Sequence, residues 1–323
     1  MRLWPALILI VSLTLTACAT PVADGRLRVI ATTGPIGDIA QAIGGERVAL
    51  RTLLGPGIDP HTYVATESDL FALQEARLIL YNGLHLEAGL ARVFDAINQS
   101  NYALAVPVAE AVPAELLLHW EDGDKTYDPH VWHDPLRWRY AVEAARDALI
   151  TVDPAGSAIY RQRSEQYLAA LQALDAELRV LIARIPPERR ILVTAHDAFQ
   201  YFGQAYGFRV EAVQGISTAS EASATDIRAL TELVVSQRIP AIFVETSVSP
   251  RTIEAVQSAA RAAGHEVRVG GELFSDSLGD PDGPAGTYFG MMRHNVQTIV
   301  AALAPSAANA VQGAAMTSEC TIE

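Results

Sequence analysis

The feature that most constrains the fold is a long helical stretch in the middle of the chain, at residues 153–185. Its apolar residues recur at spacings of three and four, with Arg and Glu between them: Leu168, Leu171, Leu174, Leu178, Leu181 and Ile182. Asp153 and Pro154 suit the cap and first turn of a helix, and Pro186-Pro187 ends it. About thirty residues make a rod of about 45 Å, longer than one small domain needs. The stretch therefore predicts a helix that lies along two lobes and fixes their relation.

Short β-rich runs alternate with helical stretches on both sides of this helix. The runs lie at 27–32, 48–54 and 78–81 before it, and at 190–194, 210–213, 241–245 and 266–269 after it. The helical stretches lie at 36–43, 67–75, 198–206, 251–263 and 287–303. Strands interleaved with helices are typical of parallel sheets. The predicted fold class is α/β, with two (β/α) lobes, each with a parallel-type sheet, joined by one long rigid α-helix. The predicted boundaries are 27–152 for the N-terminal lobe, 153–186 for the linking helix and 187–304 for the C-terminal lobe.

The N-terminus has the form of a targeting segment. Residues 1–17 carry Arg2 and a short apolar run, which is typical of a signal peptide and too short to span a bilayer. The following Cys18 completes a sequence similar to the bacterial lipobox, Leu-Thr-Ala-Cys. We therefore expect export, lipidation of Cys18 and attachment to the periplasmic face of a bacterial membrane, with an ordinary signal peptide as the alternative. Residues 18–26 are then a linker, and 305–323, with Cys320, a loosely ordered tail.

Composition excludes several classes of protein. Half of the 323 residues are hydrophobic, so the chain can bury a large core and is not a disordered protein. The formal net charge is -13 and no Lys/Arg run reaches five, which argues against a nucleic-acid partner. Two cysteines cannot form a disulfide framework or a cysteine-based zinc module.

Four polar residues stand where strands give way to loops, two before the long helix and two after it: His61, His130, His196 and Asp276. Ligands of open parallel sheets bind beyond the carboxyl ends of the strands, so these side chains can converge between the lobes. Three imidazoles and one carboxylate suit a divalent transition metal. The motif Asp-Pro-His occurs twice, at 59–61 and 128–130. Taken singly, each histidine is more typical of a satisfied polar residue in a loop than of a metal ligand.

Longer motifs resemble a known family. They are Asp59-Pro60-His61, the run 82–87 (NGLHLE), the run 128–132 (DPHVW), the run 194–202 (TAHDAFQYF), the run 214–222 (QGISTASEA) and the run 270–276. Together they are similar to the metal-binding proteins of manganese/zinc ABC importers, within the TroA-like group, over residues 27–304. The resemblance implies two lobes joined by one helix. It also implies the metal ligands His61, His130, His196 and Asp276.

The resemblance implies a function as well. The chain is expected to bind a divalent ion with high affinity and to deliver it to the permease and ATPase of an ABC importer, as a monomer and without catalysis. Manganese and zinc (Mn2+ or Zn2+) are the expected ions, with iron as a further candidate. Some members carry Glu at the position of His196, and this departure leaves zinc open. A His-rich loop found in some zinc-specific members is absent, because the run 115–128 holds only His119.

Two other functional classes stay open beside this one. A zinc hydrolase needs an open coordination position and a nearby base, whereas four ligands are available here and no HExxH motif occurs. A metal-binding surface lipoprotein or adhesin is the second alternative. Three further residues are candidates for supporting the metal site, and the sequence leaves their roles open. They are His133 as an alternate ligand, and Glu221 and Glu245 as acceptors that orient a ligand histidine.

Overall fold

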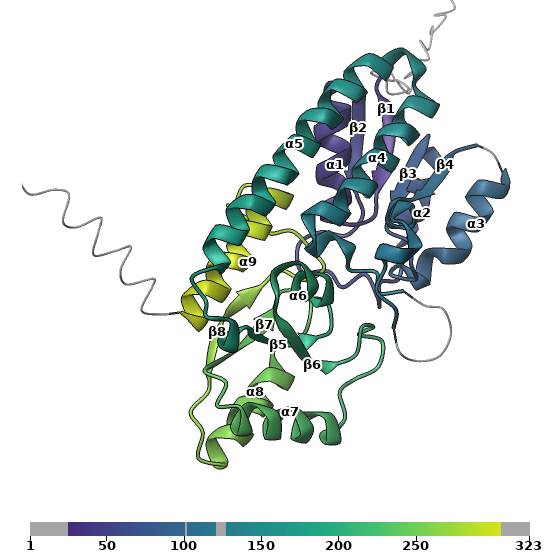
Figure 1. Ribbon diagram of the computed structural model, residues 1–323. Helices are drawn as coiled ribbons and strands as arrows, with labels where there is room; N and C mark the ends of the chain where they lie inside the picture. Colours follow the sequence, from purple (N-terminus) through teal and green to yellow (C-terminus); the bar gives the residue numbers. More distant parts are fainter. Residues whose placement is uncertain (1–24, 101, 121–126, 305–323) are drawn as a thin grey trace, which may run out of the picture.

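The computed structural model describes residues 25–100, 102–120 and 127–304, and Figure 1 shows two lobes with a long helix along one side. The strands are β1 Leu27–Ala31, β2 Val48–Thr52, β3 Leu78–Tyr81, β4 Leu104–Pro107, β5 Ile191–His196, β6 Arg209–Gln214, β7 Ala241–Glu245 and β8 Arg268–Leu273. The α-helices are α1 Gly34–Gly44, α2 Glu67–Glu75, α3 Ala91–Ser100, α4 Pro135–Val152, α5 Ser157–Ile182, α6 Gln200–Tyr206, α7 Ala224–Ser236, α8 Arg251–Ala262 and α9 Tyr288–Leu303.

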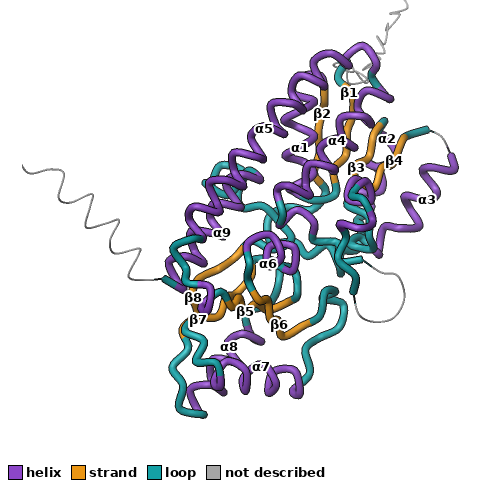
Figure 2. The backbone as a smooth tube through the Cα atoms, viewed as in Figure 1, coloured by secondary structure: helices purple, strands orange, loops and turns teal. Residues whose placement is uncertain are grey.

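The first lobe is built on a four-stranded parallel sheet of order β2-β1-β3-β4. Successive residues of a strand face opposite sides, so the two faces of the sheet have separate partners. Val29 and Leu80 join the core beneath α1, whereas Ile30 and Ile79 join a second cluster with α2 and α3. Figure 2 shows these strands enclosed between helices. Because the strands are parallel, their carboxyl ends lie at the same edge of the sheet, and the loop that carries His61 leaves β2 at this edge.

The second lobe contains two parallel pairs, β5-β6 and β7-β8, in place of one continuous sheet. Strands β5 and β7 lie side by side without a shared backbone ladder. Helices α7 and α8 pack over them in a cluster that contains Val193, Leu230 and Val256. Strand β5 runs through His196, and β8 begins at Arg268, so the predicted limits at 194 and 266 were wrong by two residues each.

The long helix α5 runs along both lobes, as the leucine spacing predicts (Figure 1). Its beginning differs from the prediction, because a separate 3-10 turn, Pro154–Gly156, precedes it and Asp153 does not cap it with its side chain. The carboxylate of Asp153 instead accepts hydrogen bonds from Arg47 Nε at 2.8 Å and from Tyr160 Oη at 2.6 Å. Asp153 therefore ties the start of α5 to the first lobe through side chains.

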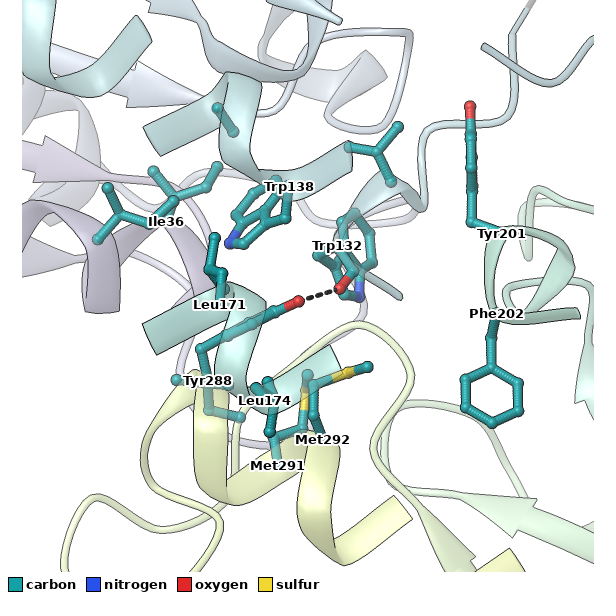
Figure 3. Close-up of a cluster of buried hydrophobic side chains, with 14 of the residues drawn as sticks. Ile36, Trp132, Trp138, Leu171, Leu174, Tyr201, Phe202, Tyr288, Met291 and Met292 are labelled. Carbon is teal, nitrogen blue, oxygen red and sulfur yellow. Dashed lines mark hydrogen bonds between the residues drawn. The ribbon is translucent and has the colours of Figure 1, made fainter. Parts of the chain in front are cut away.

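Helices α4 and α9 pack against α5 and complete a core that the two lobes share. Figure 3 shows Leu171 and Leu174 of α5 among Trp138 of α4 and Met291 of α9, all of them buried. Tyr288 Oη donates a hydrogen bond to the carbonyl oxygen of Trp132 at 2.7 Å, which joins the first turn of α9 to the first lobe. The predicted fold class, two (β/α) lobes joined by one long helix, is confirmed, and the exact domain boundaries stay a prediction.

Three predicted features lie outside the described residues. They are the signal peptide, the lipidated Cys18 and the tail that contains Cys320. Within the part of the chain that the structure describes, no helix combines the length and the apolar character that a bilayer crossing demands.

Candidate metal centre

The structure brings the four predicted site residues together between the lobes. One ligand atom of each lies within 4.8 Å of all the others: His61, His130, His196 and Asp276. His61 follows β2 and His130 precedes a 3-10 turn at Val131–His133, whereas His196 ends β5 and Asp276 follows β8. The side chains are buried, with relative exposures of 8% for His61, 0% for His130 and His196, and 1% for Asp276.

The spacing of the donor atoms matches that of ligands around one small metal ion. His61 Nε2 and His130 Nε2 are 3.2 Å apart. The two oxygens of Asp276 lie 3.5 Å from His130 Nε2 and 3.4 Å from His196 Nε2. Metal–nitrogen bonds of about 2.0–2.1 Å in a tetrahedron place neighbouring ligands about 3.3 Å apart. The four side chains are thus already spaced for coordination.

Two buried atoms of this group have no hydrogen-bond partner among the described residues: Nε2 of His196 and Oδ1 of Asp276. The other oxygen of Asp276, Oδ2, accepts a hydrogen bond from Ser247 Oγ at 2.8 Å. A buried polar atom without a partner is costly, and a bound ion is one of the ways in which proteins satisfy it. The unpaired atoms therefore fit a cation at the centre of the group.

His130 is oriented by Asp128, which the sequence analysis did not single out for a role. Oδ1 of Asp128 lies 2.7 Å from Nδ1 of His130 and also accepts the backbone N–H of His130 at 2.9 Å. A carboxylate on one ring nitrogen holds the proton there and leaves the other nitrogen free to coordinate. Nε2, the other ring nitrogen, is the atom that faces His61 and Asp276.

His196 is oriented in the same way by Glu245, the last residue of β7. Oε2 of Glu245 lies 2.5 Å from Nδ1 of His196. Oε1 accepts the backbone N–H groups of Ala195 at 2.7 Å and of His196 at 2.9 Å. The carboxylate of Glu245 thus joins β7 to the end of β5, although these two strands share no backbone hydrogen bonds. The same carboxylate holds the ring of His196 in place.

His61 differs from the other two histidines. Its backbone N–H donates to Oδ1 of Asp59 at 2.9 Å, but among the described residues no carboxylate is hydrogen-bonded to its Nδ1. Within the described part of the chain, its ring makes one contact of hydrogen-bond length, between Nε2 and Nε2 of His130. In both Asp-Pro-His motifs the aspartate accepts the backbone N–H of the histidine. Only in the second motif does the aspartate also hold the ring of the histidine, His130.

The charges of the site divide the histidines into two kinds. Burial lowers the pKa of His61 to about 4. Burial also acts on His130, but Asp128 and Asp276 outweigh it and raise the pKa of His130 to about 9. Burial would likewise raise the pKa of Asp276, yet His196 and His130 hold it well below its usual range. Burial acts on His196 as well, but the neighbouring carboxylates outweigh it and raise the pKa of His196 well above its usual range. The site therefore combines the negative charge of Asp276 with two histidines, His130 and His196, whose pKa values are raised.

The remaining candidates lie elsewhere. His133 is buried, its Nε2 lies 3.0 Å from the carbonyl oxygen of Ser275, and its ring packs on Phe199 with centroids 4.4 Å apart. Burial lowers the pKa of His133 to about 3, so it is a neutral donor to that carbonyl, outside the group of four. Glu221 is exposed and also lies outside the group.

Two α/β lobes on a shared long helix, with buried donor side chains between them, define the architecture of helix-linked solute-binding proteins. The family model "ZnuA: Zinc-uptake complex component A periplasmic" matches residues 29–302. The zinc-binding protein TroA of Treponema pallidum (strain Nichols) is 46% identical over 282 residues, which are 87% of this chain and 90% of that protein. The manganese-binding lipoprotein MntA of Bacillus subtilis (strain 168) is 43% identical over 302 residues, 92% of this chain and 98% of that one. The chain belongs to the periplasmic zinc-uptake component A family.

A solved structure is similar over nearly the same length. It is the periplasmic zinc-binding protein TroA from Treponema pallidum, with a TM-score of 0.84 and 46% identity, and the match covers 87% of this chain and 100% of that one. The resemblance to the TroA-like group, inferred from motifs, is thereby confirmed.

Proposed function

We propose that this chain binds one divalent transition-metal ion between its lobes and delivers it to the membrane permease of an ABC importer. The ligands are one nitrogen of each of three histidines and the carboxylate of an aspartate: His61, His130, His196 and Asp276. The observation that carries the proposal is the buried group of four donors with metal-like spacing, in which two atoms have no hydrogen-bond partner among the residues that the structure describes. The names of the relatives, which include zinc-binding and manganese-binding proteins, support it.

The four proposed ligands favour zinc over manganese in binding affinity. They do not decide which of the two ions the protein carries in the cell. Borderline imidazole nitrogens bind zinc more tightly than manganese by the Irving–Williams order. The two oxygens of Asp276 face different histidines, so the carboxylate can donate one oxygen or both. A second oxygen would raise the coordination number and add a hard ligand, which suits manganese better than a strict tetrahedron does.

The place of the protein in the cell is part of the same proposal. The lipobox-like sequence ending at Cys18 supports a lipid anchor, and the relative MntA is named a lipoprotein. An anchored monomer that carries its ion between two lobes can present it to a permease on the same membrane and, through the permease, to its ATPase. We propose carriage and not catalysis, because four protein donors would leave no position for a substrate on a four-coordinate ion.

Metal titration of the chelator-treated protein tests the proposal. One Zn2+ or Mn2+ per chain is expected, measured by elemental analysis after desalting. Asp276→Ala removes the only anionic ligand and should abolish stoichiometric binding, whereas the exposed Glu221→Ala should not change it. Absence of stoichiometric metal in the unmodified protein, or its retention in Asp276→Ala, would refute the assignment.

A further inference from the structure

The run 214–222, singled out in the sequence, contains no proposed ligand, yet it reaches across to the other lobe. It begins at the last residue of β6 and ends just before α7, whose first turn is capped by Ser223. We name residues 215–223 the latch loop. Midway along it, Thr218 Oγ1 donates a hydrogen bond of 2.6 Å to Oδ2 of Asp59, a residue of the first lobe. The loop is thus bonded directly to the segment that carries His61.

Asp59 connects that hydrogen bond to the site. Its other oxygen, Oδ1, accepts the backbone N–H of His61 at 2.9 Å. Two hydrogen bonds through one carboxylate therefore lead from Thr218 in the second lobe to a proposed ligand in the first. A second contact between the lobes lies close by, where Gly57 N–H donates to Ser277 Oγ at 2.9 Å. The loop before His61 is held from the opposite lobe at two points.

His61 is the proposed ligand that depends most on such support. Nδ1 of His130 is held by Asp128 and Nδ1 of His196 by Glu245. The backbone N–H of His61 is held by Asp59, but no carboxylate of the described residues is hydrogen-bonded to its Nδ1. His61 is also the most exposed of the four ligands, at 8%. A ligand whose ring has no orienting partner is positioned by its backbone, and the backbone here is positioned by Asp59.

We infer that Thr218 is a positioning residue, and that its hydrogen bond to Asp59 is a latch that keeps His61 on the metal and slows release of the ion. The inference rests on the proposed function, because it concerns the same site. It also gives the permease a means of release: any contact that draws the latch loop away from Asp59 loosens one ligand and leaves the three best-supported groups in place.

The chain offers a matched comparison for the test. Thr62 Oγ1 donates to the same Oδ2 of Asp59, at 2.9 Å, but Thr62 belongs to the same loop as Asp59 and is exposed. Thr218→Val and Thr62→Val each remove one hydroxyl donor from one oxygen, and only the first removes a contact between lobes. Thr218→Ser keeps the hydroxyl and should restore the latch.

The experiment measures release of Zn2+ from the loaded mature protein into excess chelator by stopped flow. Thr218→Val is expected to release zinc about tenfold faster than the unmodified protein, which corresponds to about 1.4 kcal/mol and is reasonable for a half-buried hydrogen bond to a charged acceptor. Thr218→Ser and Thr62→Val are expected to stay within about threefold of the unmodified rate. An unchanged rate in Thr218→Val, an equal acceleration in Thr62→Val, or no rescue by serine would overturn the latch.

A second measurement separates failure of the latch from failure of the proposed function. Amide hydrogen exchange of the metal-free protein over residues 57–62 should become faster in Thr218→Val and not in Thr218→Ser. Unchanged exchange overturns the latch whether or not metal binds. Failure of the unmodified protein to take up Zn2+ refutes the proposed function, and with it the role of the latch in metal release.

Discussion

Replacing Glu245 by glutamine tests how the site is held together while keeping the shape of the side chain. An amide oxygen can still accept the N–H groups of Ala195 and His196, which Oε1 accepts now. The amide nitrogen would then stand where Oε2 lies 2.5 Å from Nδ1 of His196, and two donors would face each other. The ring can avoid this only by moving its proton to Nε2, the atom that we propose binds the metal.

The expected loss follows from that conflict. Carboxylates that orient ligand histidines typically contribute about 10–100-fold in metal affinity, or about 1.4–2.7 kcal/mol. Glu245 and His196 are both fully desolvated in the site, with exposures of 3% and 0%, so water cannot substitute for the lost acceptor. We therefore expect Glu245→Gln to weaken Zn2+ binding toward the upper end, by about 100-fold.

A competition titration against a chromophoric chelator measures this loss, and the first lobe supplies the control. Glu87 is also buried, and it also links the ends of two strands. It accepts hydrogen bonds from Thr32 Oγ1 after β1, at 2.6 Å, and from the backbone N–H of Asn82 after β3, at 2.8 Å. Among the described residues, its hydrogen-bond partners are Thr32, Asn82 and Gly83 and include none of the four proposed ligands, so Glu87→Gln should leave zinc affinity within about threefold. A loss below threefold in Glu245→Gln, or an equal loss in Glu87→Gln, would refute the orienting role.

Four further predictions concern selectivity, pH, the core and motion. His196→Glu should cost zinc more affinity than manganese in parallel titrations, because a hard oxygen replaces a borderline nitrogen. Zinc affinity should keep rising between about pH 6 and about pH 9. The pKa of His130 is raised to about 9, so His130 is protonated at neutral pH and zinc must displace a proton to bind there. A flat profile above neutrality would contradict this. Leu174→Ala, which opens the core around α5, should lower the free energy of unfolding by about 2–5 kcal/mol in urea titrations. Because the lobes share that core, small-angle scattering should be nearly the same with and without metal.

The local parts of the fold could be predicted because they depend on short-range patterns. The leucine spacing in α5 and the strand–loop junctions before His61 and after β8 need only neighbouring residues to be recognised. Helix α4 is absent from the predicted elements, although its start carries a cap, with Asp134 accepting from the backbone N–H of Leu136. The pairing of α4 with α5 is a tertiary contact, and periodicity within either segment does not reveal it.

The supporting residues of the site were harder to predict than the candidate ligands. Asp128 and Asp59 occupy equivalent places in the Asp-Pro-His motif, yet one bonds the ring of its histidine and the other bonds Thr218 of the opposite lobe. The motif alone cannot distinguish these outcomes, because the difference lies in what the rest of the fold brings near each carboxylate. Glu245 could only be proposed as an acceptor, since it lies 49 residues from His196 and meets it through the neighbouring strands β5 and β7.

The core around α5 has a consequence for how the chain folds. Side chains from both lobes, among them Val29 and Leu80 in the first and Leu192 and Phe243 in the second, belong to one continuous cluster of buried residues. Neither lobe can lose its structure without exposing apolar surface that the other helps to cover, and large shared burial couples folding units. The two lobes should therefore unfold in a single cooperative transition, and a fragment that ends before α5 would lack part of the core that its own sheet needs.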